Sequence, residues 1–211
     1  MGQLGNYSLI LGFLISITLI FYSFFYLQNK QTLIFKNLFF FLSLQFFLVI
    51  LSFFCLIYSF IISDFSIVTV YNHSHSTKPI FYKISGTWGN HEGSLLLWLM
   101  VLTFVVLIFS LTTKKFSNGY RLLTIFFQQI IISGFFLFLL FTSNPFDYLY
   151  PVPEEGLGLN PILQDPALAI HPPILYFGYV GSSIIFSASL AALVKKNINS
   201  EWANYIKKWI Y

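Results

Sequence analysis

Five stretches of about twenty apolar residues dominate this chain and limit what it can fold into. They are residues 4–27, 38–62, 94–112, 122–142 and 173–194. A helix of this length crosses the hydrocarbon core of a bilayer, and it satisfies its backbone hydrogen bonds within itself, as lipid requires. Only 9% of the 211 residues are charged, against about 25% in soluble domains. The sequence therefore predicts an all-α integral membrane protein with about five transmembrane helices.

The basic residues predict how these helices are oriented. Nine of the eleven lie between spans one and two, between spans three and four, or after span five, and only Lys78 and Lys83 lie in the other two loops. All acids but Glu201 lie in those other loops. Because basic loops stay inside, the N-terminus is expected outside and the C-terminus inside. Two long outer loops follow, at about residues 63–93 and 143–172, and nothing in this distribution indicates nucleic acid.

Two regions are expected along the chain. Residues 1–194 form the transmembrane domain, and residues 195–211 form a basic and aromatic tail at the inner face. The tail contains Trp202 and Trp209 near Lys207 and Lys208. It could anchor at the membrane interface, or it could begin a further helix that another chain completes.

All four histidines lie in the outer loops, so any chemistry is expected on the outer face. His73 and His75 would share a face if they lay on a strand. No third ligand lies near them in the sequence, and we assign them no site. His91 lies in the segment Trp88–Ser94, where two glycines allow a tight turn and Ser94 is expected to cap a helix beginning at Leu95.

His171 lies where the last outer loop meets span five. Asp165 and Pro166 predict a helix N-cap and first helical residue. Pro172 disfavours helical angles at His171, and Pro173 is suited to starting the next helix. We therefore expect a break at His171 that frees its imidazole. The spacing fits a haem ligand and a hydrogen-bonded buried histidine equally well.

Three segments resemble the N-terminal part of the CcmF-type cytochrome c haem lyases. They are WGNHEGSLLLW at 88–98, NPF at 144–146 and LNPILQDPALAIHPPILYFGYVG at 159–181, and the resemblance runs from Ser63 to Val194. It implies a subunit of a lyase that takes haem from a CcmE-like haem chaperone. The lyase attaches that haem through thioether bonds to the Cys-x-x-Cys-His motif of apocytochrome c, on the outer face.

The resemblance also implies a cofactor site. The family's His-Pro-Pro histidine, implied to be an axial ligand of a membrane b-type haem, falls on His171. Trp88, His91 and Glu92 are expected in the haem environment, and no catalytic residue is assigned. The alternative for the segment around His91 is a capped helix start with an interfacial tryptophan belt.

The family's tryptophan-rich segment, its second b-haem histidine and its two external histidines lie beyond the region that resembles this chain. We therefore expect a split lyase in which partner chains carry these parts and share haem b with His171. The small residues of span five, from Gly178 to Ser189, are the candidate contact surface. The expected location is the mitochondrial inner membrane facing the intermembrane space, or the bacterial inner membrane if the chain is not organellar.

Two alternative functions stay open at this point. A haem-transport subunit would carry polar side chains at mid-membrane in several spans, and few are present, notably Gln45, Gln128 and Gln129. An assembly subunit without cofactor contact remains possible if His171 is only hydrogen-bonded.

Overall fold

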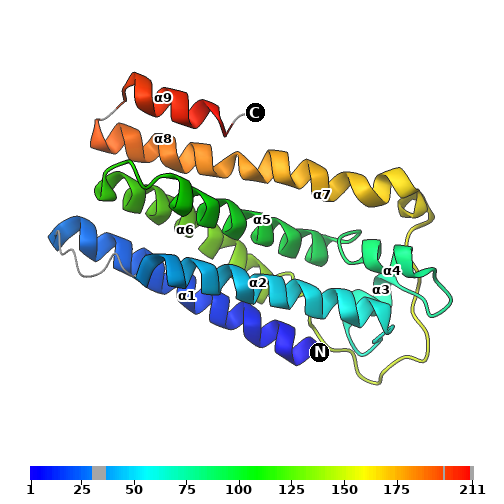
Figure 1. The fold of residues 1–211 in the computed structure, drawn as a ribbon. Helices are drawn as coiled ribbons and strands as arrows, with labels where there is room; N and C mark the ends of the chain where they lie inside the picture. The colour runs from blue at the N-terminus through cyan, green and yellow to red at the C-terminus, as the bar shows by residue number, and fades with distance from the viewer. Residues whose placement is uncertain (30–36, 197, 210–211) are drawn as a thin grey trace.

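The computed structural model describes residues 1–29, 37–196 and 198–209, and these fold into helices joined by loops (Figure 1). The elements are α1 (Gly2–Asn29), α2 (Leu38–Ile61), α3 (Val68–His73), α4 (Ile80–Gly86), α5 (His91–Thr112), α6 (Asn118–Phe141), the 3₁₀ turn η2 (Pro161–Gln164), α7 (Pro166–Gly181), α8 (Ser183–Lys195) and α9 (Ser200–Lys207). Within this described part, extended pairing is limited to an isolated bridge between Ile67 and Tyr148. The predicted all-α class is confirmed.

Five helical segments are long and apolar enough to cross a membrane, as predicted. They are α1, α2, α5, α6 and the segment Pro166–Lys195, which contains α7 and α8. The last span therefore begins at Pro166 instead of Pro173, and its interruption lies at Ser182. The orientation of the bundle stays a prediction from the charges.

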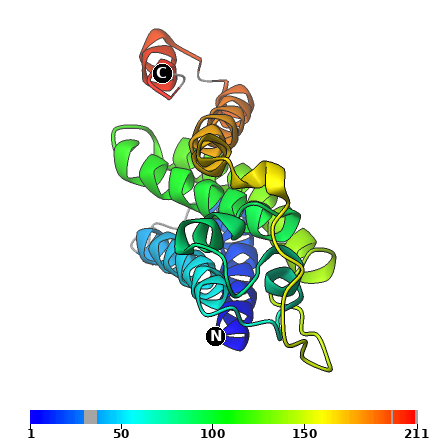
Figure 2. The ribbon, with the colours of Figure 1, turned by 90° about the vertical axis from the view of Figure 1, so that its right-hand side faces the viewer.

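The spans pack in three layers, which Figure 2 shows from the end of the bundle. Helices α1 and α2 form the first layer, α5 and α6 the middle one, and α7 with α8 the third. The middle layer supplies much of the buried core, including Leu99, Val106, Ile132 and Phe136. In α7 only Ala169 and Val180 are buried. This helix is therefore covered on one side and open on the rest.

Two neighbouring glutamines of α6 form hydrogen bonds that connect the middle layer to the first and the third layers. Gln129 Nε2 donates to Gln45 Oε1 of α2 over 2.9 Å, and Gln45 Nε2 donates back over 3.1 Å. On the other side, Gln128 Nε2 donates to Ser183 Oγ (2.9 Å) and accepts from Ser187 Oγ (2.8 Å). Polar side chains bonded across helices in this way hold membrane bundles together. The mid-membrane glutamines thus serve packing between layers.

The small-residue surface of span five takes part in this packing. Ser187, Ala188, Ala191 and Ala192 of α8 are buried, and α8 packs on α6. The expected partner contact is therefore wrong for Ser187 and Ala188, because α6 of the same chain covers them. For the exposed residues of the predicted surface it stays a prediction. Gly178 of α7 stays exposed.

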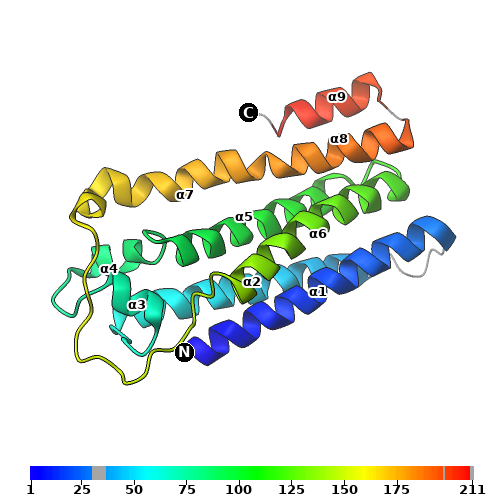
Figure 3. The same ribbon diagram turned by 180° about the vertical axis from the view of Figure 1, so that it is seen from behind.

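The first of the two long loops, between α2 and α5, contains structure that the sequence did not predict, the short helices α3 and α4. The second forms a strap, defined here as residues 143–165, which crosses the same end of the bundle before α7 (Figure 3). Backbone hydrogen bonds fasten it to residues 66–74, among them Val68 N to Asp147 O (2.9 Å) and Leu157 N to Tyr71 O (2.8 Å). This end carries all four histidines, and the N-terminus of the chain lies there as well.

The tail folds back on the opposite end of the bundle. Trp202 Nε1 of α9 donates to Tyr120 Oη over 2.9 Å, and Tyr205 Oη lies 2.6 Å from Thr112 Oγ1. Tyr205 and Ile206 are buried by these contacts. The short helix α9 is therefore packed against the chain's own α5 and α6.

Candidate functional site

His171 lies inside a continuous helix. Asp165 caps α7 by accepting from Ala167 N (2.8 Å) and Leu168 N (3.1 Å), and Pro166 is the first helical residue, as predicted. The predicted break at His171 is wrong, because α7 runs on through Pro172 and Pro173 to Gly181.

A side chain from another element compensates for one of these prolines. Proline has no N–H to donate to the carbonyl four residues earlier, so Pro173 leaves the Ala169 carbonyl without its helical donor. Trp88 Nε1 donates to that carbonyl over 2.8 Å. This bond fastens α7 to the segment before α5, which gives Trp88 a structural role.

The His171 side chain is exposed on the surface of α7. No hydrogen bond to its ring comes from residues 1–29, 37–196 or 198–209, so the hydrogen-bonded alternative finds no support in the described chain. Ile174 and Leu175, one turn further along, are 67% and 48% exposed. Gly178 has no atom within 4 Å of the place where a Cβ would stand. The imidazole therefore borders an open, apolar and locally flat helix face.

The depth of His171 follows from the length of its span. Thirty residues from Pro166 to Lys195 extend about 45 Å at 1.5 Å per residue, whereas the hydrocarbon core is about 30 Å thick. A centred span would protrude by roughly 7 Å at each end. His171 lies five residues after Pro166, or about 7 Å along the axis. For a span centred on the bilayer, the ring is therefore expected at the hydrocarbon boundary.

The start of α5 differs from the prediction. Asn90 is the N-cap, and its Oδ1 accepts from Gly93 N over 2.7 Å. The proposed cap, Ser94, lies inside the helix, where its Oγ donates to the His91 carbonyl (2.9 Å). A Cβ on Gly93 would stand 1.6 Å from the Thr87 carbonyl oxygen. The turn therefore requires glycine at position 93. The close approach of the Thr87 carbonyl to Gly93 places the cap at Asn90, four residues before Ser94.

His91 and Glu92 occupy the first turn of α5. His91 Nδ1 lies 3.0 Å from Ser143 Oγ, and its ring packs edge-on against Phe138 with centroids 5.9 Å apart. Glu92 is half-buried, and its charge is favourable at a helix N-terminus. Burial and the nearby Glu92 carboxylate raise the pKa of Asp147 in the strap. His91 thus joins α5 to α6 and the strap.

A cavity of about 340 Å³ lies between α4, α5, η2 and α7. Its walls include Trp88, His91, Leu159 and Tyr176. His171 does not line it. The structure brings Trp88 and His91 to one cavity, while His171 lies on another face of α7, so the four predicted residues do not converge on one point.

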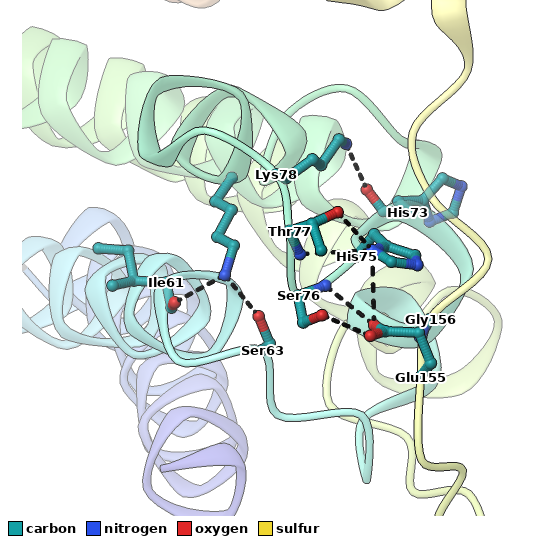
Figure 4. Close-up of polar contacts among 10 residues, drawn as sticks. Ile61, Ser63, His73, His75, Ser76, Thr77, Lys78, Glu155 and Gly156 are labelled. Carbon is teal, nitrogen blue, oxygen red and sulfur yellow. Dashed lines mark hydrogen bonds and ion pairs between the residues drawn. The ribbon is translucent and has the colours of Figure 1, made fainter.

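His73 and His75 have separate partners near the strap (Figure 4). His73 Nδ1 lies 3.0 Å from the Thr69 carbonyl oxygen inside α3, and His75 Nδ1 lies 3.0 Å from Thr77 Oγ1. His73 ends a helix, so the two do not share a strand face. Among the described residues, no group of three or more His, Cys, Asp or Glu side chains could hold a metal ion.

Glu155 fastens the strap beside this pair. Its carboxylate accepts from the Ser76 backbone N–H over 2.9 Å and from the Ser76 hydroxyl, and it lies 3.8 Å from His75 Nδ1. The hydrogen bonds from Ser76 lower the pKa of Glu155 to about 2. Nearby, burial lowers the pKa of Lys78 to about 8. We call these contacts between Glu155 and Ser76 the Glu155 latch. Sequence reasoning missed it, because the two residues lie 79 positions apart.

Comparison with known proteins places these features in a family. The model of the cytochrome C assembly protein family matches residues 88–210. The chain is 48% identical over 149 residues to the cytochrome c-type biogenesis protein CycK of Rhizobium meliloti, and 42% identical over 153 residues to the cytochrome c-type biogenesis protein CcmF of Escherichia coli. Each match covers 71% of this chain, but only 22% and 23% of the two relatives. The matched region thus spans less than a quarter of the length of each of these relatives.

The fold has a solved counterpart. A structure titled cytochrome c heme lyase CcmF superposes with a TM-score of 0.84 over 99% of this chain and 33% of that one, at 22% identity. At this identity the likeness shows the shared fold. Together with the family match over residues 88–210 and the two relatives, it shows that the chain belongs to the cytochrome c assembly protein family and corresponds to the N-terminal portion of a CcmF-type protein.

Proposed function

We propose that this chain takes part in cytochrome c maturation as the N-terminal portion of a haem lyase. In this proposal His171 supplies one axial ligand to a b-type haem shared with a partner chain. The observation that carries it is the His171 imidazole, which is exposed beside the apolar surface of α7.

The residues present fit a haem. A macrocycle needs an imidazole with an accessible nitrogen and a flat apolar surface. Ile174 and Leu175 provide the apolar surface, and Gly178 leaves room beside the helix backbone. Bound there, the haem would supply an iron that accepts the His171 nitrogen. Trp88, through its bond to Ala169, holds α7 in place.

The proposal extends to partners and location. A CcmE-like haem chaperone and apocytochrome c would approach the end of the bundle that carries the histidines and the strap. The family's remaining parts, with the second haem ligand and the tryptophan-rich segment, would be supplied by one or more partner chains. The charge pattern supports an outer position for this end, facing the intermembrane space if the membrane is the mitochondrial inner one. Relatives named as cytochrome c-type biogenesis proteins support the pathway.

The test is a haem spectrum of the purified membrane complex carrying His171→Ala. We expect the low-spin b-type absorption to be lost and to return when imidazole is added, because free imidazole can occupy the vacated position. His75→Ala is the matched control, since His75 lies at the same end and is bonded to Thr77. An unchanged spectrum in His171→Ala would remove the ligand assignment.

A second candidate is that His171 binds haem in transit from the chaperone. What favours it is the depth expected for His171 from the length of its span, at the hydrocarbon boundary instead of mid-membrane. The two candidates separate in cells that lack the haem chaperone. A resident b-haem would remain on the complex there, whereas haem in transit would be absent while the complex still assembles.

A further inference from the structure

We propose that the cavity between α4, α5, η2 and α7 receives a tyrosine side chain of a partner chain. The cavity has a volume of about 340 Å³, and the elements around it meet at the end of the bundle that carries the histidines (Figure 1). His171 does not line it. Only the existence of a partner chain is taken from the proposed function, because this contact lies away from the proposed haem site.

The size and charge of the cavity restrict what can enter it. An apolar cavity of about 150 Å³ is large enough to bind benzene, so a cavity of about 340 Å³ has room for one substituted ring. Among the described residues that line it, none is an Asp, Glu, Lys or Arg. The walls therefore offer no fixed counter-charge to an ion. A small neutral group with an apolar body fits best.

Two aromatic walls of the cavity are held in place by the rest of the fold. Trp88 Nε1 donates to the Ala169 carbonyl over 2.8 Å, and its ring stacks on Phe53 with centroids 6.4 Å apart. The ring of Tyr176 packs edge-on against Trp98, with centroids 5.3 Å apart. Aromatic rings attract one another beyond the area that they bury. Fixed rings in two walls therefore favour an aromatic occupant over an aliphatic one.

A buried hydroxyl supplies the polar contact. Ser85 of α4 lines the cavity and is only 4% exposed. Its Oγ has no hydrogen-bond partner in the part of the chain that the structure describes, although buried polar groups are nearly always paired in folded proteins. A phenol hydroxyl can both donate to a serine hydroxyl and accept from it, whereas an indole can only donate and a phenyl ring does neither. The unpaired Ser85 hydroxyl thus selects tyrosine among the aromatic side chains.

The surface beside the cavity is apolar and uncovered. Ile80 and Phe81 of α4 are 61% and 43% exposed, and Ile162 of η2 is 70% exposed. All three lie outside the five spans, so the hydrocarbon of the membrane is not expected to cover them. Exposed apolar surface of this kind marks interaction sites, and aromatic side chains in pockets dominate binding at such interfaces. The solved haem lyase shares only 33% of its length with this chain, which leaves ample chain to supply the partner segment.

The experiment compares N-acetyltyrosinamide with N-acetylphenylalaninamide, which differ by one hydroxyl. Each is titrated against the purified full-length chain in detergent, and binding is measured by saturation-transfer NMR. We expect the tyrosine amide to bind about two- to twelve-fold more tightly, the net value of one hydrogen bond. Ser85→Ala should abolish this preference, and it should fold normally because it removes only an unpaired hydroxyl.

Ser74→Ala is the matched control. The Ser74 Oγ is also buried without a partner in the described chain, but Ser74 does not line the cavity. This variant should keep the preference for the tyrosine amide.

A second pair of variants tests the apolar wall. Leu168 lines the cavity and is 43% exposed, so Leu168→Ser should fold. It should weaken the binding of both amides and leave the ratio of their affinities unchanged. Ile162→Ser is its control, because Ile162 is exposed on η2 but does not line the cavity. This variant should bind both amides as the wild type does.

The membrane complex tests the partner contact itself. There the partner's tyrosine should fill the cavity, so neither amide should bind, and the same should hold for the complex carrying His171→Ala. Amide binding to the complex as tight as to the isolated chain would overturn the partner contact. Equal affinity of the wild-type chain for the two amides, or equal losses in Ser85→Ala and Ser74→Ala, would overturn the choice of tyrosine. None of these results depends on the haem spectrum, so failure of this proposal is distinguishable from failure of the haem-ligand assignment.

Discussion

The hydrogen bond from Trp88 to Ala169 allows a quantitative test of how α7 tolerates two prolines. Trp88→Phe keeps an aromatic ring against Phe53, whose centroid lies 6.4 Å from that of Trp88, but removes the indole N–H. The Ala169 carbonyl then has neither the Trp88 donor nor a backbone donor at Pro173. A buried polar group left without a partner costs about 1–3 kcal/mol. We expect the free energy of unfolding to fall by about that amount.

The decisive comparison adds Pro173→Ala. This change restores an N–H that can donate to the Ala169 carbonyl within the helix. In the Pro173→Ala background, Trp88→Phe should therefore cost much less. The expected coupling between the two substitutions is about 1–3 kcal/mol, the cost of the unpaired carbonyl that Pro173→Ala avoids.

The assay is equilibrium unfolding in mixed detergent micelles, measured by circular dichroism for the wild type, both single variants and the double variant. Trp98→Phe is the matched control, since Trp98 meets α7 through its ring, 5.3 Å from that of Tyr176. It should show no coupling to Pro173→Ala. Additive effects of Trp88→Phe and Pro173→Ala would refute the assignment of the indole as the substitute donor.

Two further predictions concern the histidine end of the bundle. Gly93→Ala should prevent the Asn90 cap from forming and sharply lower the yield of folded protein, because the new Cβ would stand 1.6 Å from the Thr87 carbonyl oxygen; thermal unfolding in detergent measures this. For the Glu155 latch, the folded pKa of about 2 lies below the ordinary 4.5. The stabilisation of the strap by the Glu155 carboxylate is therefore complete above pH 4.5 and is lost as the pH falls towards 2. Amide exchange in the strap, corrected for intrinsic rates, should accelerate across that pH window.

Each of these two has its own control. Gly134→Ala should be tolerated, because no atom lies within 4 Å of the added Cβ, and equal damage from both alanines would contradict the steric explanation. Glu155→Gln should make exchange in the strap fast already at neutral pH and remove its dependence on acid. Unchanged protection in Glu155→Gln would show that the backbone bonds of the strap suffice alone.

The sequence predicts those features of this protein that depend on local composition. The five spans follow from hydropathy alone, and the cap at Asp165 follows from a side chain bonding two and three residues ahead. The continuity of α7 could not be predicted. The bias of Pro172 against helical angles at His171 is visible in the local sequence, whereas the donor that supports the helix, Trp88, lies 81 residues from Ala169. The cap at Asn90 depends on the close approach of the Thr87 carbonyl to Gly93. Helix and turn propensities of the individual residues contain no information on that contact.

The bond from Trp88 also determines what His171 can contact. Successive residues of an α-helix are rotated by about 100°, so His171 is turned by about 200° from Ala169. Ala169 is one of the two buried residues of α7, and Trp88 holds its carbonyl towards the bundle. The His171 ring must then point away from the described helices. Whatever occupies its nitrogen approaches from outside this bundle, which is what a haem shared with a partner chain requires.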